Sequence, residues 1–143
     1  MEFNLFMIDA KCKKYDTGYD LNYEDQYLVS LIIETPLYDK NVPCDFFGWN
    51  DEDLEKHKVF HWIGSHLSRF KGKKLFTLVG EIGTEKIDLG FLWYAAKRKP
   101  FVLHLRELSP NKKISGRLFV YLNDVNGFYR NNSGSYDLQV ESI

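Results

Sequence analysis

The chain has 143 residues, of which 44% are hydrophobic and 16% aromatic, and its 19 basic and 20 acidic residues leave a formal net charge of -1. This length fits one domain with a sizeable core, spanning residues 1–143, and the hydrophobic content excludes a disordered chain. A balanced charge gives no field that would attract nucleic acid, so we expect no nucleic-acid partner.

The cellular setting is inferred from cysteine content and from apolar runs. With only Cys12 and Cys44, isolated thiols are expected rather than a disulfide framework. No apolar run has the length of a membrane-spanning helix, so we expect no transmembrane segment. Residues 1–9 lack a basic region and a sustained apolar stretch, which argues against a signal peptide. We therefore expect a cytoplasmic protein, with release to act outside the cell left open.

The first half of the chain predicts two strands and little helix. Residues 3–8 and 27–35 are apolar and β-branched enough for strands, and Pro36 should end the second or introduce a bulge, because proline cannot donate to a ladder. Residues 18–25 between them are polar and turn-like. Residues 51–58 predict a turn of helix at most, because they offer no sustained apolar face, and residues 61–70 are ambiguous.

The second half predicts further strands separated by Gly, Pro and Asn turns. They cover residues 75–82, 91–95, 102–108, 117–122 and 136–141. Short apolar runs at this spacing are typical of antiparallel sheets packed face to face. We therefore predict an all-β fold, an antiparallel β-sandwich of jelly-roll-like form.

The segment from Asn123 to Tyr136 is the most informative part of the chain. Asp124 supplies a carboxylate at the end of a predicted strand, and Asn131 and Asn132 supply amide oxygens seven and eight positions later. The intervening turn can fold back so that these oxygens converge, as Ca²⁺ requires with its six to eight oxygen ligands. Composition alone also fits a plain turn, because Asn-Gly and Ser-Gly are favourable turn dipeptides.

Other chemistry has weaker support. The G-x-S-x-G spacing of a nucleophile elbow is missing, and nothing selects a Cys–His pair. His57, His61 and His66 fall within ten positions, but without HExxH or a cysteine pair they indicate a loop or an aromatic cluster rather than zinc. We expect no enzyme. A glycosidase would need two carboxylates spaced across a cleft, and the sequence alone cannot place such a pair.

The run from Asn123 to Tyr136 closely resembles the signature of the calcium-dependent, galactose-binding bacterial lectins of the PA-I galactophilic type, and the match is sharp over residues 117–140. The resemblance implies a galactose-binding-domain-like sandwich. It also implies a Ca²⁺ site in which three side chains and two backbone carbonyls are ligands: Asp124, Asn131, Asn132, and the carbonyls of Phe128 and Tyr38.

The same resemblance implies how a sugar would bind. Vicinal hydroxyls of a galactose-containing glycan would contact the ion and the residues around it: Asp124, Asn131, Asn132 and Val125. The family reads the primary hydroxyl with a His and a Gln on another loop, for which His57 or His61 is the candidate here. Tyr129 or Trp49 is expected to pack on the sugar ring. The family's homo-oligomers gain avidity from several weak sites.

An alternative stays open. The chain could be a β-sandwich interaction protein that retains the loop as a structural turn or a calcium staple. Its partner would then be a protein or a membrane surface.

Overall fold

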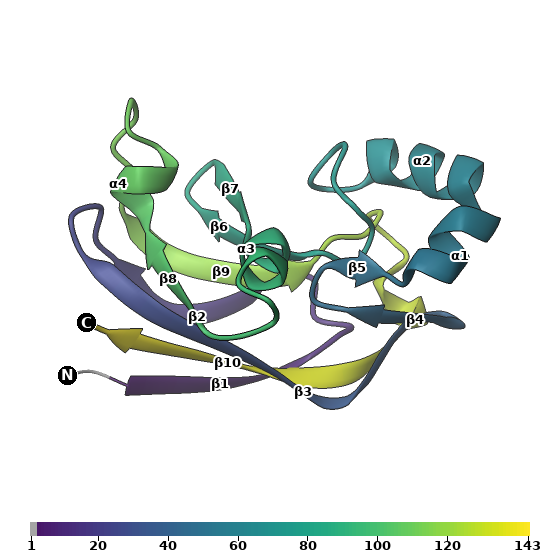
Figure 1. The fold of residues 1–143 in the computed structure, drawn as a ribbon, viewed down its shortest axis with the longest axis horizontal. Helices are drawn as coiled ribbons and strands as arrows, with labels where there is room; N and C mark the ends of the chain where they lie inside the picture. The colour runs from purple at the N-terminus through teal and green to yellow at the C-terminus, as the bar shows by residue number, and fades with distance from the viewer. Residues whose placement is uncertain (1–2) are drawn as a thin grey trace.

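The computed structural model describes residues 3–143 as two antiparallel sheets with their inner faces packed together (Figure 1). The first sheet contains β1 (Phe3–Asp9), β10 (Asn132–Ser142), β3 (Gln26–Asp39), β4 (Val42–Asp45) and β5 (Gly48–Trp49), with β8 (Phe101–His104) also paired to β3. The second contains β2 (Tyr15–Leu21), β9 (Gly116–Leu122), β6 (Leu78–Ile82) and β7 (Glu85–Asp88). The predicted all-β, sandwich-like fold is confirmed.

The core lies between the two sheets. Inward-facing residues of β9, such as Leu118 and Val120, belong to the same buried cluster as Leu138 and Val140 of β10. Buried and more exposed positions alternate along β2 and the first half of β9, as in strands with one face on the core, whereas the last three residues of β9 are all buried. Each such side chain contributes about 1.5–3 kcal/mol of hydrophobic free energy when buried.

Helices occupy several places where the sequence predicted strands or turns. They are α1 (Asp51–Lys56), α2 (Lys58–Leu67), α3 (Leu89–Ala95), α4 (Leu105–Leu108) and the 3₁₀ turn η1 (Tyr129–Asn131). The strand expected over residues 91–95 is therefore wrong, as is the end of the one expected over 102–108. The region 18–25, expected as a turn, begins with the end of β2.

Local capping explains the helix α3. Asp88 Oδ1 accepts the Phe91 N–H at 2.9 Å and the Thr77 hydroxyl at 2.7 Å, so the side chain caps the helix and ties it to the residue that precedes β6. At Gly90 an added Cβ would lie 1.9 Å from the Phe46 carbonyl oxygen, so only glycine allows this approach. The helix α3 thereby packs on the sandwich (Figure 1).

Strand β3 continues through Pro36 to Asp39, four residues beyond the predicted end. The pairing with β10 shifts register around Gly134, where φ is +105° and a Cβ would lie 2.3 Å from the Pro36 carbonyl oxygen. A bulge of this kind tolerates a proline, because one ladder position is skipped there. The extension carries Asp39 to the end of the sandwich.

Two expectations about the whole chain can be compared with the fold. Cys12 and Cys44 are free, as predicted. Among the described residues, no helix has the length and apolar character that a bilayer crossing requires.

Candidate functional site

Asp124 lies just after β9, at one end of the sandwich. Its side chain is buried, with 4% of the residue exposed. Oδ1 accepts the Val125 N–H at 2.7 Å, whereas the buried Oδ2 has no hydrogen-bond partner within the described part of the chain. Asp124 therefore presents one unsatisfied carboxylate oxygen to its surroundings.

Asn132 opens β10 and lies beside Asp124. Its residue is 1% exposed, and Nδ2 donates to the Ala10 carbonyl at 3.2 Å. The Asn132 Oδ1 atom is buried and, like Asp124 Oδ2, finds no hydrogen-bond partner among residues 3–143. Two of the predicted ligands thus meet, each with an unpaired acceptor oxygen.

Asp39 offers a third possible oxygen ligand, which the sequence did not indicate to us. We call the place where Asp39, Asp124 and Asn132 lie the corner of the sandwich. It is the β3 residue paired with Asn132, and its Oδ2 accepts the Trp49 indole N–H at 2.9 Å. Strand alternation directs Asp39 to the same side as the buried Leu37, which leaves the ring of Tyr38 on the other side, 38% exposed. An aspartate two positions after an apolar inward residue would have indicated this placement.

The electrostatics of the corner favour protonated carboxyls when no cation is bound. Burial, and after it the negative charge of Asp39, raise the pKa of Asp124, and with the opposing effects of the Val125 N–H and the neighbouring Asn132 amide this pKa is about 7. Burial also raises the pKa of Asp39, which the bond from the Trp49 indole partly offsets. Burial therefore disfavours the ionised form of both carboxyls.

The remaining predicted ligands lie on the loop and near the end of β3. Asn131 and Phe128 are exposed, and the Phe128 carbonyl accepts the Asn131 N–H at 3.1 Å. The Asn131 carbonyl accepts the Lys40 N–H at 2.9 Å, which holds the loop against the end of β3. Tyr38 pairs with Ser133 in the ladder.

The residues expected to contact a sugar are placed differently from one another. Val125 is partly buried next to Asp124, and its backbone bridges to Ser68. His57 is exposed at the junction of α1 and α2, and no hydrogen bond among residues 3–143 links it to Asp124. Tyr129 is 1% exposed, so its ring cannot pack on a sugar.

Trp49, the other ring expected to pack on a sugar, is also buried. It is 5% exposed, and its ring centroid lies 6.5 Å from that of Phe60 and 5.0 Å from that of His61. Both expectations of a ring that stacks on a sugar are therefore wrong, because the Tyr129 and Trp49 rings are buried. The aromatic ring that the loop does expose is Phe128, at 54%.

Asn123 fixes the backbone on the other side of Asp124. Its Oδ1 accepts the Phe70 N–H at 2.9 Å, and its Nδ2 lies 3.1–3.3 Å from four oxygens, of Ser68, Phe70, Lys73 and Lys74. The Arg69 N–H also donates to the Asp124 carbonyl at 3.1 Å. The segment that follows α2 is thereby tied to the candidate site by a buried amide.

The donor set limits the kind of ion that the corner can hold. No group of three or more His, Cys, Asp or Glu side chains in the described residues is arranged to hold a metal. An ion here would depend on two carboxylates, amide oxygens and carbonyls. That is an oxygen-only set, suited to a hard cation such as Ca²⁺ and unsuited to zinc.

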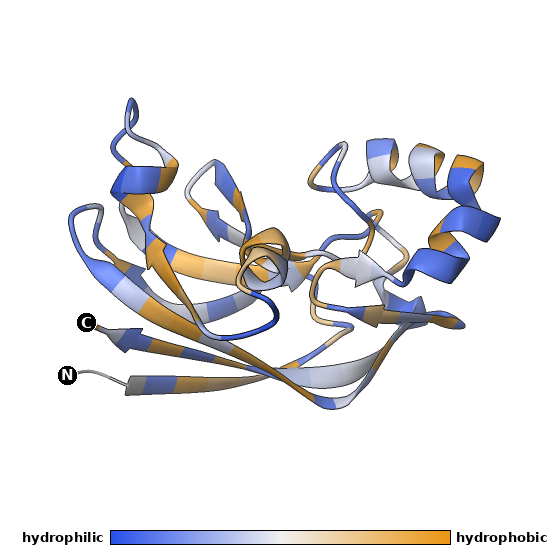
Figure 2. Ribbon diagram, in the orientation of Figure 1, coloured by the Kyte–Doolittle hydropathy of each residue, from blue (hydrophilic) through white to orange (hydrophobic). Residues whose placement is uncertain are grey.

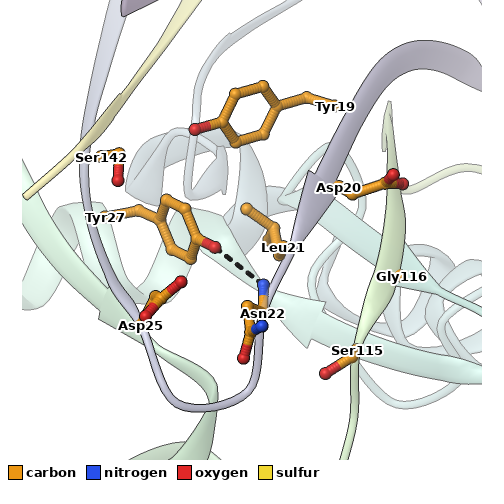
Figure 3. Close-up of a pocket in the computed structure, with 9 residues that line it drawn as sticks. All are labelled: Tyr19, Asp20, Leu21, Asn22, Asp25, Tyr27, Ser115, Gly116 and Ser142. Carbon is orange, nitrogen blue, oxygen red and sulfur yellow. Dashed lines mark hydrogen bonds between the residues drawn. The ribbon is translucent and has the colours of Figure 1, made fainter. Parts of the chain in front are cut away.

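A pocket of about 570 Å³ lies at the opposite end of the same strands (Figure 3). It is lined by the end of β2, the start of β9 and the end of β10, and its walls include Tyr19, Tyr27, Asp20 and Asp25. None of the predicted metal or sugar residues lines it. In Figure 3 the Tyr27 hydroxyl accepts the Asn22 N–H, which closes the turn between β2 and β3.

Comparison with known proteins adds no assignment: neither a scan against protein-family models nor a search of curated proteins finds a match to this chain.

Proposed function

We propose that the corner formed by Asp124 and Asn132 binds Ca²⁺, and that the ion holds hydroxyls of a galactose-containing glycan. The observation that carries the proposal is the pair of buried, unpartnered oxygens, Asp124 Oδ2 and Asn132 Oδ1. An unsatisfied buried acceptor costs about 1–3 kcal/mol, and a cation satisfies both at once. Asp39 adds a second negative charge, which strengthens the attraction for a divalent ion.

The loop would complete the site. Asn131 and the carbonyls of Phe128 and Tyr38 are the further ligands that we assign, and Val125 and His57 the further sugar contacts. Since Asp124 and Asn132 are almost fully buried, a glycan would approach from the side of the exposed Asn131 and Phe128. Binding involves no bond cleavage, so we assign no enzymatic activity.

The burial of Asp124 and Asn132 also favours a second candidate function. A Ca²⁺ ion enclosed on the protein side would act as a staple between β9 and β10 without offering positions to a ligand. The chain would then be a β-sandwich interaction protein, and calcium would set its stability rather than its specificity.

Thermal melting of protein freed of divalent ions tests both proposals. Ca²⁺ alone should raise the Tm, and galactose should raise it further only when Ca²⁺ is present, because only ligands of the folded state stabilise it. A rise with Ca²⁺ that galactose never augments would support the staple. No response to Ca²⁺ would refute both.

Matched variants identify the site that responds. Asp124→Asn removes the charge with little change in shape and should abolish the effect of Ca²⁺. Asp20→Asn removes an exposed carboxylate at the opposite end of the molecule and should leave the effect intact. A Ca²⁺ response that survives in Asp124→Asn would place the ion elsewhere.

A further inference from the structure

The helix α2 is oriented with its apolar side away from the protein. Five side chains form the α2 apolar face, and they are 48–70% exposed: Val59, Phe60, Trp62, Ile63 and Leu67. The buried residues of the helix are polar, His61 and Ser65. A surface helix of a globular protein ordinarily buries its apolar stripe, so this arrangement is inverted.

Specific contacts fix that orientation. His61 Nε2 accepts the Leu75 N–H at 3.1 Å, and its ring lies 5.0 Å from the ring of Trp49. Gly64 faces Leu75 so closely that a Cβ would lie 2.9 Å from the leucine Cδ1 atom. Turning the α2 apolar face inward would break the His61 bond and force Ile63 or Phe60 into a space that fits glycine. The inverted orientation therefore belongs to the fold.

The α2 apolar face is large enough to form an interface. Five large side chains at these exposures present on the order of 500 Å² of apolar surface, which is near the upper limit for a lone patch on a monomer. Two copies facing each other would bury roughly 1,000 Å², the lower bound for a specific protein interface. Figure 1 shows α1 and α2 standing off the end of the sandwich, where a partner can approach.

Charge is distributed unevenly along the chain on either side of the α2 apolar face. The segment before α2 is acidic in Asp51, Glu52, Asp53 and Glu55. The segment after it is basic, and its exposed cations are Lys71 and Lys73, because Arg69 lies over the ring of Tyr121 and Lys74 over that of Phe47. Only two of the acidic residues are paired locally, Glu52 with Lys56 at 3.2 Å and Glu55 with Lys58 at 3.5 Å. Exposed pairs of this kind are weak and leave the acidic segment net negative.

We propose that a second copy of this chain covers the α2 apolar face, with the two α2 helices antiparallel about a two-fold axis. In that arrangement the acidic segment of each copy meets the basic segment of the other, and the same patch serves on both sides, as two-fold symmetry requires. A parallel arrangement would oppose like charges. An anionic bilayer fits less well, because the acidic segment would face its headgroups.

The first test is sedimentation equilibrium of the wild-type protein in chelator, so that the result does not depend on metal or glycan. We expect a dimer at tens of micromolar. Ile63→Glu places a charge in the centre of the face and should weaken dimerisation at least tenfold, with an unchanged far-UV CD spectrum. Met7→Glu removes a 76% exposed side chain of β1 and should leave the dimer intact.

A charge exchange tests the antiparallel arrangement. The double variant Lys71→Glu, Lys73→Glu should weaken the dimer, and mixing it with the double variant Glu52→Lys, Glu55→Lys should restore association as a heterodimer. The proposal is overturned by a monomeric wild type at these concentrations, by an Ile63→Glu variant as dimeric as the wild type, or by charge variants that do not complement. Binding of a monomer to phosphatidylserine vesicles would overturn it in favour of a membrane.

Discussion

The raised pKa of Asp124 predicts that the calcium-free protein loses stability as pH rises. The carboxyl ionises near its ordinary pKa of 3.8 in the unfolded chain and at about 7 in the folded one. Asp124 therefore keeps its proton to a higher pH in the folded state than in the unfolded one. The stability that this proton contributes is fully present below about pH 4 and is lost as pH rises through about 7. A shift of about three pKa units corresponds to about 4 kcal/mol.

Calcium should reverse this dependence. A cation at the corner stabilises the ionised carboxylate and competes with the proton, so stabilisation by Ca²⁺ should grow between pH 5 and 8. Asp39, whose pKa is also raised, adds to the loss in the same direction. Asp124→Asn has no titrating group at position 124, so its stability should depend less on pH. In the absence of calcium it should be more stable than the wild type at pH 8.

The assay is urea unfolding followed by tryptophan fluorescence from pH 4.5 to 8.5, in buffers passed over chelating resin, because soluble chelators weaken at acid pH. Asp20→Asn serves as the control and should retain the wild-type profile. A calcium-free wild type whose free energy of unfolding does not fall by several kcal/mol, or an Asp124→Asn variant with the same slope, would refute the reasoning.

Two further predictions concern the support of the corner. Gly134→Ala should destabilise the protein by about 2–4 kcal/mol, because the new Cβ would clash with the Pro36 carbonyl in addition to the strain of a positive φ. The control Gly72→Ala, at φ +82° with open space around it, should cost only about 1 kcal/mol. Equal losses of unfolding free energy in urea would contradict the close approach of Gly134 to Pro36. Trp49→Phe should lower stability by about 1–2 kcal/mol, since it removes the donor to Asp39, and this loss should be larger at pH 8 than at pH 5; a loss independent of pH would argue that only packing is affected.

Strands with β-branched residues and one dry face were predictable from the sequence. β1, β3, β9 and β10 contain such runs, and their existence, though not their ends, is confirmed. β3 ran past its predicted end because a bulge at Gly134 accommodates Pro36, and register shifts of this kind depend on the partner strand. The aspartate that the extension delivers, Asp39, was missed for the same reason.

The helices were harder to predict, for two different reasons. α3 contains a short apolar run that also suits a strand, and Asp88 three residues before Phe91 was the capping signal that distinguished them. α2 has helical periodicity in Val59, Ile63 and Leu67, but that stripe faces solvent, so tertiary contacts of His61 decide its orientation. The meeting of Asp124 with Asn132 followed from the loop, whereas their burial did not.

The hydrogen bonds of Asn123 have a consequence for protein engineering. The region from Cys44 to Lys74 cannot be deleted as a whole, because within residues 3–143 its last residues supply all the hydrogen-bond partners of the fully buried Asn123 side chain. A shortened protein that joins β5 directly to β6 would leave that amide unsatisfied next to Asp124. A minimal version must keep Ser68 to Lys74, and it must also keep His61, which accepts the Leu75 N–H, and Ser65, whose carbonyl accepts the Ser68 hydroxyl.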